Sequence, residues 1–125
     1  MIQEAQERLK GVAQKTGLSY SNSVSDLAGC KVYLKLENLQ RTGSFKLRGA
    51  YNKVASLTPA EREKGVIAAS AGNHAQGVAL AASEYGCQSV ICMPKHAPLS
   101  KIAATKGYGA NVVLHGDFFD ETAAK

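Results

Sequence analysis

Three short apolar segments, each followed by a stretch of helical periodicity, constrain the fold of this chain more than any other feature. The segments lack the alternation of a half-exposed strand, and such runs followed by helices are typical of a parallel sheet covered on both faces. The sequence therefore predicts an open three-layer α/β domain with a mainly parallel sheet. The expected strands span residues 66–69, 90–93 and 112–114, and the expected helices span 73–85, 100–106 and a segment begun by Asp117.

The part of the chain before these units is less regular. Residues 1–14 indicate a polar helix, 16–25 a loop rich in serine and glycine, and 31–36 an alternating, half-buried strand. A helix is expected from Phe45, because apolar residues then recur at helical spacing up to Leu57. Thr58, Pro59 and Glu61 form a capping box with proline at the first helical position, and Gly65 would end that short helix.

Composition excludes several classes of function. Fifteen basic and ten acidic residues give a net charge of +5, but no basic run interleaves with aromatic residues as a nucleic-acid surface requires. A local site for an anionic ligand fits this charge better. The three cysteines form no CxxC pair and have no histidine at zinc-ligand spacing, so we expect no metal site and reduced thiols, as in the cytosol. No apolar run approaches the roughly 20 residues of a membrane span.

Lys46 is the first candidate for chemistry. Ser44 is a suitable N-cap, which places Lys46 and Arg48 in the first turn of their helix, where each cation costs about 0.3–1 kcal/mol against the macrodipole. One interpretation is that both side chains extend into solvent and the cost is tolerated. The other is that the helix start, the arginine and an apolar setting favour the neutral amine, the nucleophile that a Schiff base needs. Spacing alone leaves both open.

A second candidate is the turn that starts at Ser70. Serine ends a buried strand, Gly72 permits a tight turn, and a helix begins at about Asn73, so exposed N–H groups and the helix dipole would form an anion site. Capping by Ser70 or Asn73 alone explains the same pattern. His74 is a candidate acid or base, or equally a capping or packing histidine.

The two segments together resemble one family. Residues 35–50 closely resemble the cofactor-lysine segment of fold-type II pyridoxal-phosphate enzymes. Residues 70–77 are similar to their substrate-carboxylate loop in its threonine dehydratase form, and residues 94–95, 103–105 and 109–116 continue the likeness. The resemblance covers nearly everything from Lys15 onward.

The resemblance implies roles for individual residues. Lys46 would hold pyridoxal 5'-phosphate as a covalent Schiff base and then act on the substrate Cα proton. Phe45 would pack the pyridine ring, and Asn73 would bind the cofactor's ring hydroxyl. The substrate carboxylate would lie against Ser70, Ala71, Gly72, Asn73 and His74. L-threonine would give 2-oxobutanoate and ammonia, and L-serine would give pyruvate.

Two positions narrow the choice within the family. Serine racemases place a second serine where this chain has Ala71, and alanine cannot transfer a proton, so racemisation is disfavoured. Many relatives have proline where this chain has Gly17. The glycine favours the short, catabolic type of threonine dehydratase. The choice between a catabolic role and one in isoleucine biosynthesis stays open.

The resemblance also implies that half of the site is missing. The last expected helix has run only about two turns at Lys125, and the family's phosphate loop lies well beyond that point. We therefore expect an N-terminal fragment, inactive alone, with residues 1–30 belonging to a larger domain and 31–125 forming a small α/β domain. The complete protein would be a cytoplasmic homo-oligomer. The alternative is a non-catalytic, truncated paralogue that binds small anions or a partner subunit.

Overall fold

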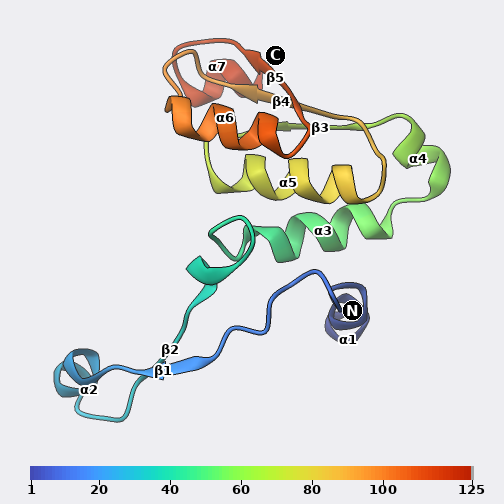
Figure 1. Cartoon of the computed structure of the whole chain (residues 1–125). Helices are drawn as coiled ribbons and strands as arrows, with labels where there is room; N and C mark the ends of the chain where they lie inside the picture. Colours follow the sequence, from blue (N-terminus) through green and yellow to red (C-terminus); the bar gives the residue numbers. More distant parts are fainter. Residues whose placement is uncertain (125) are drawn as a thin grey trace.

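A parallel three-stranded sheet forms the centre of the fold (Figure 1). The structure is a computed structural model that describes residues 1–124. The strands lie in the order β3 (Val66–Ala69), β4 (Ser89–Met93) and β5 (Asn111–Leu114). Residue 66 pairs with 89 and residue 90 with 111, and both strand pairs are parallel. The predicted sheet is confirmed.

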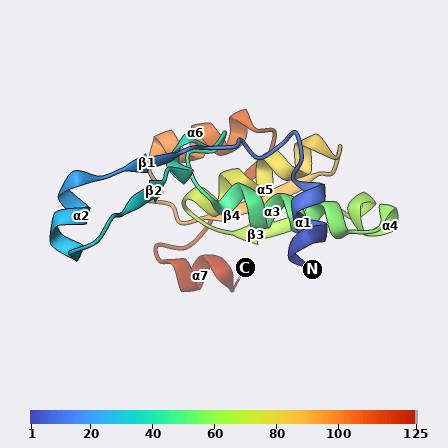
Figure 2. The ribbon, with the colours of Figure 1, turned by 90° about the horizontal axis from the view of Figure 1, so that it is seen from below.

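Helices cover both faces of this sheet. Helices α5 (Asn73–Glu84) and α6 (Leu99–Gly107) lie on one face, and α7 (Phe119–Ala123) lies on the other (Figure 1). Figure 2 shows the same layers from the side of α3. Helix α3 (Lys46–Ser56) packs on α5 from the side away from the sheet, and the short α4 (Pro59–Glu63) leads into β3. The three-layer αβα architecture is therefore confirmed, with α3 as an outer helix.

Helix α5 forms the middle of the core. It lies between the sheet and α3, and every residue from Ala75 to Ala82 is buried. Many of its residues are alanine and one is glycine, so short side chains let the sheet and α3 approach its backbone closely. From α3 the buried partners are Leu47, Ala50, Tyr51 and Val54, the face that the helical spacing predicts.

The N-terminal third departs from expectation. Helix α1 (Ile2–Arg8) is shorter than the helix predicted over residues 1–14, because the turn that follows it includes Gly11 in the left-handed region at φ 75°. The predicted loop over 16–25 contains β1 (Leu18–Tyr20) and the start of α2 (Asn22–Ala28). The strand predicted over 31–36 is only β2 (Tyr33–Lys35), and its residues are exposed rather than half-buried. Strands β1 and β2 form an antiparallel ribbon that extends away from the sheet layers (Figure 1).

Local capping signals are partly confirmed. The capping box at Thr58 is present, and Gly65 turns the chain at φ 82°. The helix predicted to begin at Asp117 begins at Phe119, because the Glu121 carboxylate accepts the Asp117 N–H and holds it in the preceding turn. Ser44 is likewise not the N-cap: Phe45 takes that position, although the Ser44 hydroxyl accepts the Lys46 N–H at 3.3 Å.

The sheet has an exposed edge at β3. The middle strand β4 is largely buried, whereas Ile67 on β3 is 72% exposed. An apolar groove of about 450 Å³ runs beside β3 and α3. None of the described helices is long and apolar enough to cross a membrane.

Candidate active site

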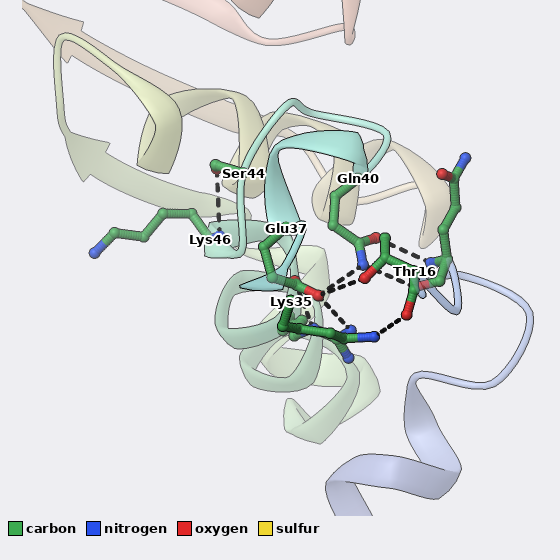
Figure 3. Close-up of polar contacts among 8 residues, drawn as sticks. Thr16, Lys35, Glu37, Gln40, Ser44 and Lys46 are labelled. Carbon is green, nitrogen blue, oxygen red and sulfur yellow. Dashed lines mark hydrogen bonds and ion pairs between the residues drawn. The ribbon is translucent and has the colours of Figure 1, made fainter. Parts of the chain in front are cut away.

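Lys46 is the first residue of α3, as the sequence predicts. Its side chain is exposed, and Nζ lies 5.4 Å from the centroid of the Phe45 ring. That ring is itself 59% exposed. The Lys46 side chain extends away from the polar cluster behind it (Figure 3). The amine and the aromatic face are therefore both accessible to a ligand.

An ion pair closes the loop that carries Lys46. Arg48 donates from Nε to Glu37 Oε2 at 2.8 Å and from Nη2 to Glu37 Oε1 at 2.9 Å. Glu37 lies in the short 3-10 helix η1 (Glu37–Leu39), just before the loop, and Arg48 lies two residues after Lys46. Thr16 donates a further, longer hydrogen bond to Glu37 at 3.4 Å. The two-pronged geometry fixes the orientation of both side chains.

The pair is ionised at neutral pH. The hydrogen bonds from Arg48 lower the pKa of Glu37 from 4.5 to about 2, more than partial burial raises it. The same contact raises the pKa of Arg48. Since the charges of Glu37 and Arg48 cancel, the pair holds the lysine segment in place without adding net positive charge beside Lys46.

Gln40 attaches the N-terminal segment to the same loop. It is 4% exposed, and its amide pairs with both backbone groups of Gln14: Nε2 donates to the carbonyl at 2.8 Å, and Oε1 accepts the N–H at 2.9 Å. Lys35 also donates to the carbonyl of Thr16 (Figure 3). Residues 14–16 are thus bound to the lysine segment by side chains.

The turn after β3 is built by one hydroxyl. Ser70 Oγ accepts the N–H groups of Gly72 and Ala75, each at 3.3 Å. Gly72 is the N-cap of α5, so Asn73 and His74 have no carbonyl one turn earlier to which they can donate. With the dipole of a 12-residue helix behind them, these N–H groups suit a carboxylate or phosphate.

Asn73 and His74 are both exposed, but they point to different surroundings. Asn73 Oδ1 accepts a hydrogen bond from Lys101 Nζ at 3.1 Å, which brings a cation from α6 to the turn. His74 lines the apolar groove beside β3; Lys46, Phe45 and residues 70–73 do not. The groove is therefore separate from most of the predicted site.

The packing of α3 on α5 brings the lysine and the turn together. A Cβ at Gly77, one helical turn after Asn73, would lie 3.2 Å from the carbonyl carbon and oxygen of Lys46. The backbone of Lys46 therefore lies directly against the helix whose N-terminus forms the anion site. Within residues 1–124, no hydrogen bond joins Lys46 Nζ to the turn.

Sequence reasoning missed the supporting roles of Glu37, Gln40 and Lys101, and it named Arg48 only as a cation beside Lys46 and not as the partner of Glu37. Glu37 and Arg48 carry opposite charges on either side of Lys46, and that was the available signal. Their contact depends on an irregular loop folding back, which periodicity does not predict. The Lys101–Asn73 contact, 28 residues apart, depends on how α6 packs beside α5.

Comparisons with known proteins agree with this geometry. The sequence model of a family described as "Pyridoxal-phosphate dependent enzyme" matches residues 9–125. The L-threonine ammonia-lyase of Thermotoga maritima is 59% identical over 120 residues, which are 96% of this chain and 30% of that protein. The catabolic L-threonine dehydratase of Escherichia coli is 56% identical over 124 residues, 99% of this chain and 38% of that protein. This chain spans about a third of the length of these relatives.

The fold is also similar to that of a solved racemase structure. Maize serine racemase superposes with a TM-score of 0.90 at 36% identity, over 97% of this chain and 37% of that one. The fold therefore does not separate an ammonia-lyase from a racemase, and single residues of the site must do so.

Proposed function

We propose that this chain, which belongs to the family of pyridoxal-phosphate-dependent enzymes, carries the cofactor lysine and the carboxylate-binding turn of a threonine ammonia-lyase. The enzyme would convert L-threonine to 2-oxobutanoate and ammonia, and L-serine to pyruvate and ammonia. The observation that carries the proposal is the contact between the Lys46 backbone and α5, the helix that begins at the anion-binding turn. The activity is proposed for a protein of the relatives' length, because this chain spans about a third of it.

The residues present fit the cofactor. Lys46 supplies an accessible primary amine for its aldehyde, Phe45 supplies an exposed aromatic face for its ring, and Asn73 supplies an amide for its ring hydroxyl. The bound cofactor supplies an electron sink that stabilises negative charge at the substrate Cα. Lys46, once its amine is free, would move the proton at that Cα.

The turn orients the substrate. The substrate carboxylate would accept hydrogen bonds from the backbone around residues 70–74. The Ser70 hydroxyl holds this turn in shape by accepting the N–H groups of Gly72 and Ala75. Ala71 has no group that can carry a proton on the opposite face of the substrate. Proton transfer from one side only favours loss of the β-hydroxyl over inversion at Cα.

Three further parts of the proposal rest on family membership more than on geometry. Residues 1–30 would belong to a larger domain and 31–125 to a small α/β domain. The support is that β1 and α2 lie outside the sheet layers, and β2 at the start of the second range pairs with β1 and lies there too. The complete protein would be a homo-oligomer and would work in the cytoplasm.

The test is to express the complete gene and replace Lys46 by alanine. The parent protein should show the visible absorbance of protein-bound pyridoxal phosphate and release ammonia from L-threonine, and Lys46→Ala should lose both. Lys53→Ala is the matched control, because Lys53 is an exposed lysine on the same helix. Either signal surviving in Lys46→Ala would mean that the cofactor lysine is misassigned.

A further inference from the structure

Gly77 occupies the point of closest approach between α5 and the start of α3. A Cβ there would lie 3.2 Å from the carbonyl carbon of Lys46, 3.2 Å from its carbonyl oxygen and 3.3 Å from the Cβ of Ala50. Contacts this short are tighter than nine in ten that real Cβ atoms make. Any side chain at position 77 would therefore push one of the two helices by a few tenths of an ångström.

Separating the two helices has a cost, because both contribute buried side chains to the contact between them. Helix α3 is held by Leu47, which is fully buried next to Lys46, and by Val54 two turns later. Helix α5 is held on its other side by fully buried residues, Ala75 and Ala79 among them. The first turn of α3 lies at the end of its helix and next to an irregular loop, so it is the part that yields, and Lys46 moves with it.

We infer that Gly77 is a positioning residue, which fixes the place of Lys46 relative to the carboxylate-binding turn. This inference rests on the proposed role of Lys46. One helix serves both halves of the site: its N-terminus forms the turn, and its second turn supports the lysine backbone. Reacting groups must be held within about 0.5 Å of their productive geometry, and a misplacement of about 1 Å costs about 100-fold in rate. A shift of a few tenths of an ångström should therefore cost about tenfold.

Gly49 provides the matched control. It lies on α3, three residues after Lys46, and a Cβ at Gly49 would meet nothing within 4 Å. Alanine is a better helix former than glycine at both positions. Helix propensity alone therefore predicts the same result for Gly77→Ala and Gly49→Ala, and only the contact with Lys46 predicts a difference.

The experiment compares three variants of the protein expressed from the complete gene. Val54→Ala joins the two glycine variants, because it opens a cavity in the same helix interface without touching Lys46. We expect Gly77→Ala to lower kcat for L-threonine about tenfold and to slow borohydride trapping of pyridoxal phosphate on Lys46 by a similar factor. Gly49→Ala and Val54→Ala should keep both within about twofold, although Val54→Ala melts at a lower temperature. Trapping is quantified on the Lys46 peptide by mass spectrometry.

Two results would overturn the inference. The first is a kcat and a trapping rate of Gly77→Ala within twofold of those of Gly49→Ala. The second is an equal loss of both in Val54→Ala, because lowered stability alone would then explain the effect. If Gly77→Ala does not fold, the double variant Gly77→Ala, Ala50→Gly replaces it. This variant lacks the contact with the Ala50 Cβ but keeps the two contacts with the Lys46 carbonyl, and it must lose kcat and trapping rate to the same extent. A parent protein that traps no cofactor on Lys46 would refute the proposed function instead. Crystal structures of the two glycine variants then decide the inference, because an unmoved Lys46 in Gly77→Ala contradicts it.

Discussion

The two halves of the candidate site are held in place by different means. The lysine segment, residues 37–48, depends on contacts between residues that are not neighbours in sequence: the ion pair of Glu37 with Arg48, 11 residues apart, and the bond of the Gln40 amide to Gln14, 26 residues apart. The turn after β3 depends on a strand, a helix and one serine hydroxyl that are all contiguous in sequence. The position of the lysine should therefore be sensitive to charge and pH, whereas the turn should tolerate both.

The largest expected effect comes from removing one partner of the ion pair. Arg48→Met leaves the Glu37 carboxylate, which is only 19% exposed, without its main hydrogen-bond donor. We expect a loss of about 2–3 kcal/mol in the free energy of unfolding, measured by urea titration of the protein from the complete gene. The double variant Glu37→Gln, Arg48→Met should lose less, because no unpaired charge remains. Equal losses in the single and double variants would show that the pair does not act as a unit.

The second effect is a pH dependence confined to the lysine segment. The pKa of Glu37 falls from 4.5 to about 2 on folding, so the ionised form is favoured in the folded state. The stabilisation is therefore complete above about pH 4.5 and is lost as the pH falls toward about 2. At 1.36 kcal/mol per pKa unit the ceiling is about 3 kcal/mol, and the partial exposure of Arg48 reduces it to about 1–2 kcal/mol.

Glu37→Gln isolates this contribution. Between pH 6 and pH 3, the parent protein should lose about 1 kcal/mol more of its free energy of unfolding than Glu37→Gln does, because a carboxyl with a folded pKa of about 2 is still mostly ionised at pH 3. Parallel curves for the two proteins would contradict the assignment of the low pKa to the contact with Arg48.

The smallest effect is expected in the turn. Ser70→Ala removes the acceptor for the N–H groups of Gly72 and Ala75 and should cost about 1 kcal/mol of stability, as the loss of a helix cap does. It should raise KM for L-threonine more than it lowers cofactor trapping on Lys46, because only the carboxylate site changes shape. Ser56→Ala, at the exposed end of α3, is the control. A loss of stability as large as that of Arg48→Met would remove the contrast between the two halves.

The same contrast explains what the sequence predicts well. Strand β3, helix α5 and the capping box at Thr58 are confirmed within a residue, because their signals are local: a continuous apolar run, a helical face and cap residues at fixed spacing. The turn at Ser70 was predicted for the same reason. In the ribbon of β1 and β2 both strands are exposed. The alternation over 31–36 therefore predicted a burial and a length that β2 does not have, and β1 was taken for a loop.

The supporting contacts of the lysine segment were beyond local reasoning. Lys46 itself was placed correctly at a helix start, yet nothing in the spacing indicates that Glu37 folds back to Arg48 or that Gln40 reaches Gln14. Such contacts depend on the path of an irregular loop. The role of Gly77 was equally hidden, since a glycine within a helix has no signal of its own until its neighbour is known.

The uncovered margin of the sheet also affects how these 125 residues behave when handled by themselves. Strand β3 is an edge of the described sheet and pairs only with β4, and Ile67 on it is exposed; such an edge is a template onto which strands of other molecules can add. Concentrated samples should therefore tend to aggregate through backbone pairing even when every molecule is correctly folded.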